Sequence, residues 1–157
     1  RIDETLKRLN FNSSIFHSDI RSYKSEKRWS KIILDAPCSS TGTLRRHPDI
    51  MHLKKESDIR SLTKLQSELL LSAWKFLANE GHLIYCTCSL EKEEGENQIL
   101  KFVNENKNAE IDKIKSGEAA ELKELITKEG FLRIFPNHLN EIGGTDGFFI
   151  AKLKKVS

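Results

Sequence analysis

Two apolar runs, separated by one long helical pattern, constrain the fold of this 157-residue chain most strongly. The first run is "KIILD" at residues 31–35, and the second is "HLIYCT" at residues 82–87. Residues 58–79, which lie between them, repeat apolar side chains at helical spacing. A strand, a helix and a second strand in this order favour parallel pairing, because a parallel connection needs a long crossover. The sequence therefore predicts an α/β fold.

The ends of these elements also carry sequence signals. Ser57 is the predicted N-cap of the long helix, and Gly81 is its predicted C-terminal stop. The unbroken run of Ile32, Ile33 and Leu34 is typical of a strand that is buried on both faces.

The remaining segments complete one domain without an internal repeat. Residues 106–130 are polar and indicate a surface loop with an exposed helix near 118–128. The other expected elements are a helix end at 3–10, a short strand at 13–19, a helix at 93–106 with Ile99, Leu100 and Val103 facing inward, and an antiparallel hairpin of strands at 130–136 and 146–155. The expected sheet is mostly parallel with an antiparallel C-terminal edge.

The bulk composition restricts the class of protein. Hydrophobic residues make up 38% and charged residues 31%, and the net charge of +3 permits a nucleic-acid partner without arguing for one. No apolar run is long enough to span a membrane. Three cysteines cannot pair completely, so we expect a reducing, cytoplasmic location. Residue 1 is Arg and the only methionine is Met51, so we expect either a piece of a longer protein or a processed or trimmed chain.

Acidic residues and cysteines follow the predicted strands. Asp19, Asp35 with Cys38, and Cys88 lie at or just past three strand ends, where α/β sheets bind their ligands. A zinc site is disfavoured, because Cys-x-Cys with one distant cysteine is not a usual ligand spacing. Cys86, inside the apolar run, fits an inert buried thiol, whereas Cys88 fits a reactive one. Asp19 could instead be a turn residue, and Asp35 a strand-end carboxylate that is bonded to local N–H groups.

Four motifs together are more specific than any single residue. "ILDAPCSSTGTLRRHPDI", "LQSELL", "YCTCSLEKEEGENQI" and "GTDGFFIAKL" closely resemble the bacterial RsmB-type (Sun/Fmu) ribosomal RNA cytosine-5 methyltransferases. The resemblance covers nearly the whole chain, apart from the polar stretch near 106–130. It implies a Rossmann-like catalytic domain that uses S-adenosylmethionine, and an RNA substrate, which we expect to be 16S ribosomal RNA.

The resemblance also implies roles for individual residues. Cys88 matches the nucleophile of "TCS", and Cys38 matches the cysteine that assists product release. Asp35 matches the aspartate near the methyl donor and the target base, and Pro37 of the same motif is expected in the cofactor cradle. Asp19 matches the acidic residue that contacts the adenine end of the cofactor. At Cys86 the family more often has alanine, and we interpret this cysteine as a small buried substitution without chemistry.

The implied chemistry explains these residue types. A thiolate that adds to carbon 6 of cytosine makes carbon 5 able to attack a sulfonium methyl group, which is covalent nucleophilic catalysis. A carboxyl such as Asp35 could donate a proton to ring nitrogen 3 or stabilise one there. The base that removes the carbon-5 hydrogen is not identified by the sequence. The target base must be unstacked to reach the pocket.

A basic loop follows Cys38. Its cations are Arg45, Arg46, Lys54 and Lys55, and we expect them to contact RNA phosphates, although such charges are often only a solvated face. No metal is expected.

Two parts of the resembling enzymes are not recognisable in residues 1–157. These are the glycine-rich cofactor loop, with its neighbouring strands 1 and 2, and an N-terminal RNA-binding domain. We therefore expect residues 1–157 to be part of a catalytic domain. The alternative is a non-catalytic RNA-binding or complex-forming remnant.

Overall fold

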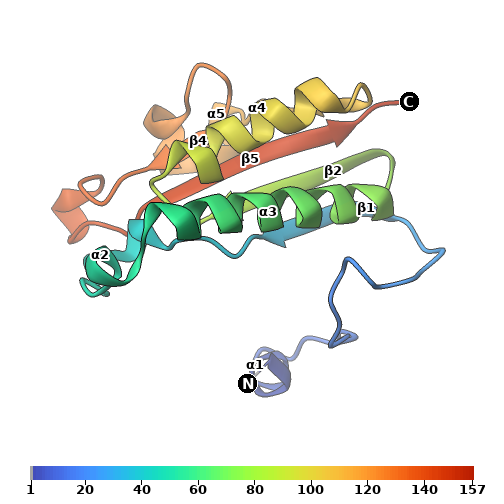
Figure 1. Ribbon diagram of the computed structural model, residues 1–157, viewed down its shortest axis with the longest axis horizontal. Coiled ribbons are helices and arrows are strands. Elements are labelled where there is room, and N and C mark those ends of the chain that lie inside the picture. The colour runs from blue at the N-terminus through green and yellow to red at the C-terminus, as the bar shows by residue number, and fades with distance from the viewer. Residues whose placement is uncertain (1) are drawn as a thin grey trace.

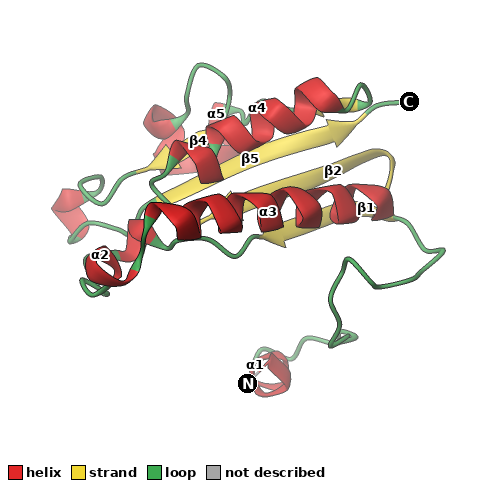
Figure 2. Cartoon of the chain, in the orientation of Figure 1, coloured by secondary structure: helices red, strands yellow, loops and turns green. Residues whose placement is uncertain are grey.

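The computed structural model describes residues 2–157 and confirms the parallel pairing of the two apolar runs. β1 (Trp29–Asp35) pairs in parallel with β2 (Leu77–Thr87), with Asp35 opposite Cys86. The connection contains η1 (Thr41–Thr43), α2 (Ile50–Leu53) and the long helix α3 (Glu56–Phe76). α3 and α4 (Glu96–Glu105) lie side by side on one face of the sheet (Figure 1). The layers are a sheet and a helical cover (Figure 2).

One strand runs against the other four. β5 (Phe148–Lys155) is antiparallel to β2, to β3 (Ala109–Ile111) and to β4 (Leu132–Ile134). The sheet order is β1-β2-β5-β3, and β4 pairs with β5 beside β3. The mostly parallel strand direction and the β4–β5 hairpin are thus confirmed. The antiparallel strand itself lies one place inside the sheet, because β3 and β4 share the outer edge.

The predicted boundaries of the long helix are wrong. α3 begins at Glu56, where the Asp58 carboxylate accepts the Lys55 N–H at 2.9 Å. It ends at Phe76, and the chain passes directly into β2. Gly81 lies within β2, where a Cβ would come within 2.8 Å of the Ala78 carbonyl oxygen, so the glycine serves a close backbone approach.

The core lies between the sheet and the two helices. Leu83 and Tyr85 of β2 are fully buried there, as is Ile99 of α4. Val103 also packs against this core, but Leu100 is 40% exposed, so its predicted inward position is wrong. Helix α4 starts only at Glu96, after the short turn η2 (Lys92–Glu94), and its buried apolar side chains are Ile99 and Phe102.

The opposite face of the sheet is partly open. Ile33 of β1 is 72% exposed, so the prediction that this run is buried on both faces is wrong. Side chains alternate along a strand, and only Ile32 and Leu34 point toward the helices and pack on the core.

Residues 2–28 contain no strand. α1 (Ile2–Arg8) is followed by an irregular stretch that runs apart from the sheet (Figure 1). The strand predicted at 13–19 is therefore wrong. A β-strand needs a backbone partner, and within residues 2–157 this segment pairs with no strand.

The polar region between α4 and β4 is more structured than expected. It contains β3, which the sequence analysis missed. The exposed helix is shorter than predicted and is divided into α5 (Ser116–Ala119) and the 3₁₀ turn η3 (Ala120–Leu125). A further 3₁₀ turn, η4 (Asn140–Ile142), lies in the β4–β5 loop.

Candidate active site

The thiols of Cys38 and Cys88 meet at the carboxyl edge of the sheet. Cys38 lies three residues beyond β1 and Cys88 one residue beyond β2. Because β1 and β2 are parallel, both loops leave the sheet at the same edge, and the two Sγ atoms lie 3.4 Å apart. Both side chains are half-buried and neither forms a disulfide. The sequence analysis placed these residues at one rim, and the structure brings them into contact.

Hydroxyl groups tie the two cysteine loops together. Ser39 Oγ lies 3.2 Å from Ser89 Oγ, and both side chains are fully buried. Thr41 Oγ1 accepts the N–H of Leu90 at 2.9 Å. These contacts join the residues that directly follow Cys38 to those that directly follow Cys88.

Gly42 brings a third segment to the site. Its N–H donates to the Cys88 carbonyl oxygen at 2.9 Å, and its carbonyl oxygen accepts the N–H of Gly147 at 2.7 Å. A Cβ on Gly42 would lie 2.2 Å from the Gly147 oxygen, so only glycine fits. The start of β5 is thereby fixed against the loop that carries Cys88.

The contact between the thiols separates their pKa values. The Cys38 thiol donates to the Cys88 sulfur, and this hydrogen bond lowers the pKa of Cys88 to about 6 while raising that of Cys38. The Ser40 hydroxyl, 3.5 Å from Cys88 Sγ, also lowers the pKa of Cys88. Burial and the nearby Asp35 charge oppose that shift. We assign the thiolate to Cys88 because Cys38 is the more deeply buried of the two thiols, and burial favours the protonated form.

Cys86 and Asp35 lie next to this pair. They are opposite each other in the β1–β2 register, and Cys86 Sγ is 3.7 Å from Asp35 Oδ1. Burial raises the pKa of the Cys86 thiol to about 11, so it stays protonated near neutral pH. Cys86 is half-buried rather than buried, and Asp35 and Pro37 are exposed at the edge.

Asp19 does not lie at a strand end. Its carboxylate binds Arg21, with Asp19 Oδ2 2.6 Å from Arg21 Nη2, and this ion pair lowers the pKa of Asp19 to about 2. Arg21 also reaches Glu68 of α3 at 2.8 Å. The three residues form an exposed chain of charges, so the Asp19 carboxylate is held by Arg21.

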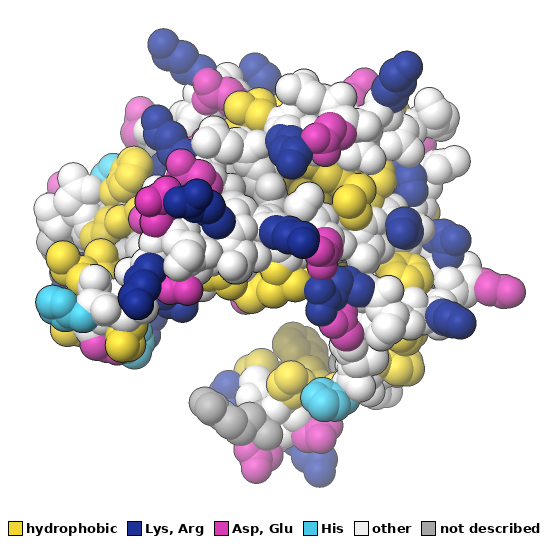
Figure 3. All heavy atoms as spheres, viewed as in Figure 1, with side chains coloured by type: hydrophobic (Ala, Val, Ile, Leu, Met, Phe, Trp, Pro, Cys, Tyr) yellow, Lys and Arg dark blue, Asp and Glu magenta, His cyan; other side chains and the backbone are white. Residues whose placement is uncertain are grey.

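The four basic residues of the loop differ from one another. Arg46 Nε donates to Asp146 Oδ2 at 2.9 Å and forms an ion pair with that carboxylate. Arg45 packs against Gly144, where a Cβ would meet its guanidinium at 2.3 Å. Lys54 and Lys55 are exposed at the end of α2. Figure 3 shows basic side chains beside hydrophobic and histidine side chains at the left of the molecule, where α2 lies in Figure 1.

The sequence analysis missed several residues of the site. Gln66, Glu94 and Asp146 lie in the quoted motifs "LQSELL", "YCTCSLEKEEGENQI" and "GTDGFFIAKL", but only the tertiary contacts reveal what they touch. The only sequence signal for these three residues was that they lie within the motifs.

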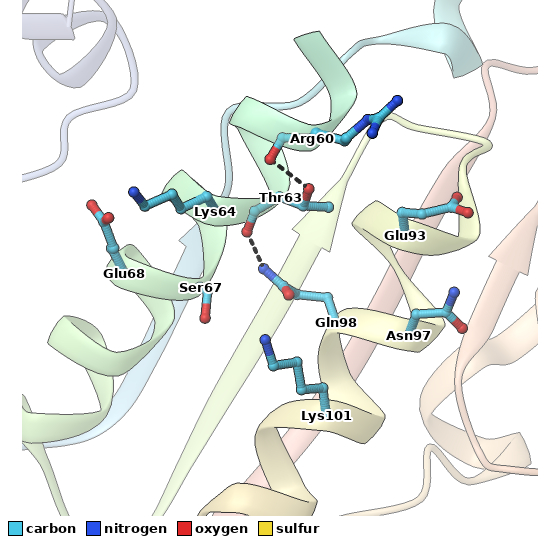
Figure 4. A pocket seen from close by; sticks show the side chains of 9 residues that line it. All are labelled: Arg60, Thr63, Lys64, Ser67, Glu68, Glu93, Asn97, Gln98 and Lys101. Atoms are coloured by element: carbon cyan, nitrogen blue, oxygen red, sulfur yellow. Dashed lines mark hydrogen bonds between the residues drawn. The ribbon is translucent and has the colours of Figure 1, made fainter. Parts of the chain in front are cut away.

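A cavity of about 510 Å³ lies elsewhere, between α3 and α4. Figure 4 shows charged side chains around it, including Arg60 and Lys101, and the Gln98 amide that donates to the Thr63 oxygen at 2.8 Å. None of the predicted site residues lines it. Within residues 2–157, no three His, Cys, Asp or Glu side chains are grouped to hold a metal ion, and no helix has the length and apolarity needed to span a membrane.

Comparisons with known proteins agree with the motifs. The family model described as 16S rRNA methyltransferase RsmB/F matches residues 1–154. Ribosomal RNA small subunit methyltransferase B of Photorhabdus laumondii is 38% identical over 99% of the chain and 34% of that protein. The protein of the same name from Cronobacter sakazakii is 39% identical over 99% of the chain and 34% of its own length. The chain therefore spans about a third of the length of these relatives.

Solved structures show the same fold. NSun6 from Pyrococcus horikoshii, solved with SFG, matches 99% of the chain and 38% of its own chain, with a TM-score of 0.78 and 29% identity. A methyltransferase homologue from the same organism matches 98% of the chain and 48% of its own, with a TM-score of 0.74 and 32% identity. These matches confirm the expected methyltransferase fold. Since the family model runs over residues 1–154, the chain belongs to the RsmB/F family of 16S rRNA methyltransferases.

Proposed function

We propose that this chain carries the nucleophile of an S-adenosylmethionine-dependent methyltransferase that modifies carbon 5 of cytosine in small-subunit ribosomal RNA. The observation that carries the proposal is the Cys38–Cys88 contact of 3.4 Å, with the thiolate on Cys88 and Asp35 at the same edge. The names of the relatives support the RNA substrate. One structural relative was solved with SFG, an S-adenosylmethionine analogue, which supports the cofactor. A ribosomal RNA substrate also favours a cytoplasmic location.

The residues at the edge fit a methyl donor in part. Asp35 and Pro37 are exposed beside the thiol pair and are free to contact a ligand. Asp19 is engaged by Arg21 and would have to exchange that partner for a contact with the adenine end of the cofactor. We propose that residues 1–157 form part of the catalytic domain and that the remaining length of the relatives supplies the rest of the cradle. When bound, the cofactor supplies an electrophilic methyl group on sulfur.

The proposed reaction assigns one task to each side chain. Cys88 Sγ forms a bond to carbon 6 of the cytosine, and Asp35 stabilises the proton at nitrogen 3. Carbon 5 gains a methyl group and loses its hydrogen as a proton, after which the bond from Cys88 to carbon 6 breaks. The Cys38 thiol, already donating to Cys88 Sγ, is placed to protonate or stabilise that leaving thiolate. Cys86 has no assigned step.

RNA binding is proposed for the basic loop, with unequal contributions. The Arg45 guanidinium, Lys54 and Lys55 are exposed and suit phosphate contacts. Arg46 is partly neutralised by Asp146, and we assign it mainly to holding the loop against the start of β5.

Trapping on RNA that contains 5-fluorocytosine tests the proposal, because fluorine at carbon 5 cannot leave as a cation and the adduct persists. In the complete gene product, Cys88→Ala should form no adduct. Cys38→Ala should accumulate an adduct even on unmodified cytosine, because release is slowed. RNA binding without any adduct in the wild type would instead favour a non-catalytic RNA-binding role.

A further inference from the structure

The backbone on both sides of Cys38 is held by two fully buried polar side chains. Gln66 Nε2, from α3, donates to the Pro37 carbonyl oxygen at 2.9 Å. Glu94 Oε1 accepts the Ser39 N–H at 2.9 Å, and Glu94 Oε2 accepts the Ser39 hydroxyl at 2.5 Å. Gln66 Nε2 also donates to Glu94 Oε1 at 3.0 Å. Cys38 therefore lies between two residues whose polar backbone groups are fixed by one Gln–Glu pair.

The Gln66 and Glu94 side chains are buried without the full set of partners that such polar groups usually have. Glu94 and Gln66 have 0% exposure, and the donors to the Glu94 carboxylate are a backbone N–H, a hydroxyl and an amide, none of which is a cation. Gln66 Oε1 is buried and has no hydrogen-bond partner. Burying a carboxylate without a cation and leaving an amide oxygen unpaired both oppose folding. Such costs are expected where a site requires a fixed geometry.

Glu94 is also linked to the strand that carries the nucleophile. It lies six residues after Cys88, and its backbone carbonyl oxygen accepts the Tyr85 hydroxyl at 2.9 Å. Tyr85 belongs to β2 and is fully buried. A continuous path of hydrogen bonds thus runs from β2 through Glu94 to Ser39, which adjoins Cys38.

We propose that Glu94, with Gln66, is a positioning residue that sets Cys38 against Cys88, so that the Cys38 thiol can donate to the Cys88 sulfur. The proposal rests on the proposed function, in which these two cysteines act in sequence on one base. The negative charge of Glu94 also raises the pKa of Cys38, which keeps the proton on the donor side of the pair.

Two thiol measurements test this role without cofactor or RNA. Among residues 1–157, a Cys86→Ala background leaves only Cys38 and Cys88. The first measurement is the rate at which diamide oxidises this pair to a disulfide. Formation of one disulfide transfers two electrons and two protons from the thiols to diamide. The second is the pH dependence of Cys88 alkylation by iodoacetamide, located by peptide mass spectrometry.

In this background, Glu94→Ala should slow disulfide formation by roughly tenfold or more, because reaction rates fall steeply when reacting atoms are misplaced by about 1 Å. In the same variant, the pH midpoint of Cys88 alkylation should rise from about 6 toward 9, which is the ordinary pKa of a cysteine. Glu94→Gln keeps an acceptor for the Ser39 N–H. Its rate of disulfide formation should therefore stay within about threefold of the background rate, a much smaller change than misplaced reacting atoms would cause. Glu93→Ala, at the exposed neighbouring glutamate, is the matched control and should change neither value.

A folded Glu94→Ala protein with background disulfide rate and alkylation midpoint would overturn the proposal. Near-ultraviolet circular dichroism establishes folding at the assay temperature. If Glu94→Ala does not fold, Ser39→Ala removes only the hydroxyl contact and should shift both readouts in the same direction by less. Background values for a folded Ser39→Ala would then refute it. Loss of RNA trapping with normal thiol responses would contradict the methyltransferase proposal and leave the positioning role intact.

Discussion

Replacing Gly42 with alanine tests how closely the cysteine loops and the start of β5 must approach. A Cβ at residue 42 would lie 2.2 Å from the Gly147 carbonyl oxygen and 2.9 Å from that of Cys88. Both obstacles are backbone atoms, so no side-chain rotation relieves the overlap. The backbone segments must therefore separate, which breaks the Gly42–Cys88 and Gly147–Gly42 hydrogen bonds of 2.9 and 2.7 Å.

The expected loss of stability follows from these two effects. Overpacking costs about 1–3 kcal/mol, and each lost hydrogen bond costs about 0.5–1.5 kcal/mol. Gly42→Ala should therefore lower the free energy of unfolding by about 2–6 kcal/mol. Urea unfolding followed by fluorescence of Trp29 and Trp74 measures it. Because the Cys88 carbonyl group must move, the rate of Cys88 alkylation should change as well.

Gly117→Ala is the matched control. Residue 117 lies in α5, its φ is not positive, and a Cβ there would meet no atom within 4 Å. Alanine in a helix should stabilise the protein by up to about 1 kcal/mol. If Gly42→Ala unfolds within about 0.5 kcal/mol of the wild type, as a neutral surface change would, the close approach does not constrain the site and the reasoning fails.

Three other measurements probe the same site. The rate of Cys88 alkylation should rise with a midpoint near pH 6 rather than 9. The stability that the lowered pKa of Cys88 contributes should be complete above pH 9 and should disappear as the pH falls through 6. An alkylation midpoint near pH 9 would contradict the assignment of the thiolate to Cys88. Arg133→Ala breaks a buried ion pair with Glu96 and a 2.6 Å hydrogen bond to the Ser89 carbonyl oxygen, so urea unfolding should show a loss of about 3–5 kcal/mol. An unchanged urea midpoint would argue against this stabilising role. Arg45→Ala should reduce the salt dependence of RNA binding in a filter assay by about one unit of slope, whereas Arg46→Ala should reduce it less, and equal effects would refute the division of roles.

The sequence alone located the main features of the fold and the site. Apolar periodicity is a local property, so the strands around Ile33 and Tyr85, the helix between them and the final hairpin could be predicted from short windows. Parallel strands that share a helical crossover end at one edge, so Asp35, Cys38 and Cys88 could be assigned to one site without coordinates.

Tertiary structure decided the features that depend on distant contacts. Glu94 lies in the glutamate-rich run "EKEEGE", where a solvated position would be expected, yet it is fully buried because Ser39, 55 residues earlier, donates to it. The exposure of Ile33 depends on which elements cover each face of the sheet. The inner position of β5 depends on pairing with β2, β3 and β4, and backbone pairing leaves no local pattern. The 3.4 Å separation of the thiols arises from both loops together, because each loop alone could place its cysteine elsewhere along the edge.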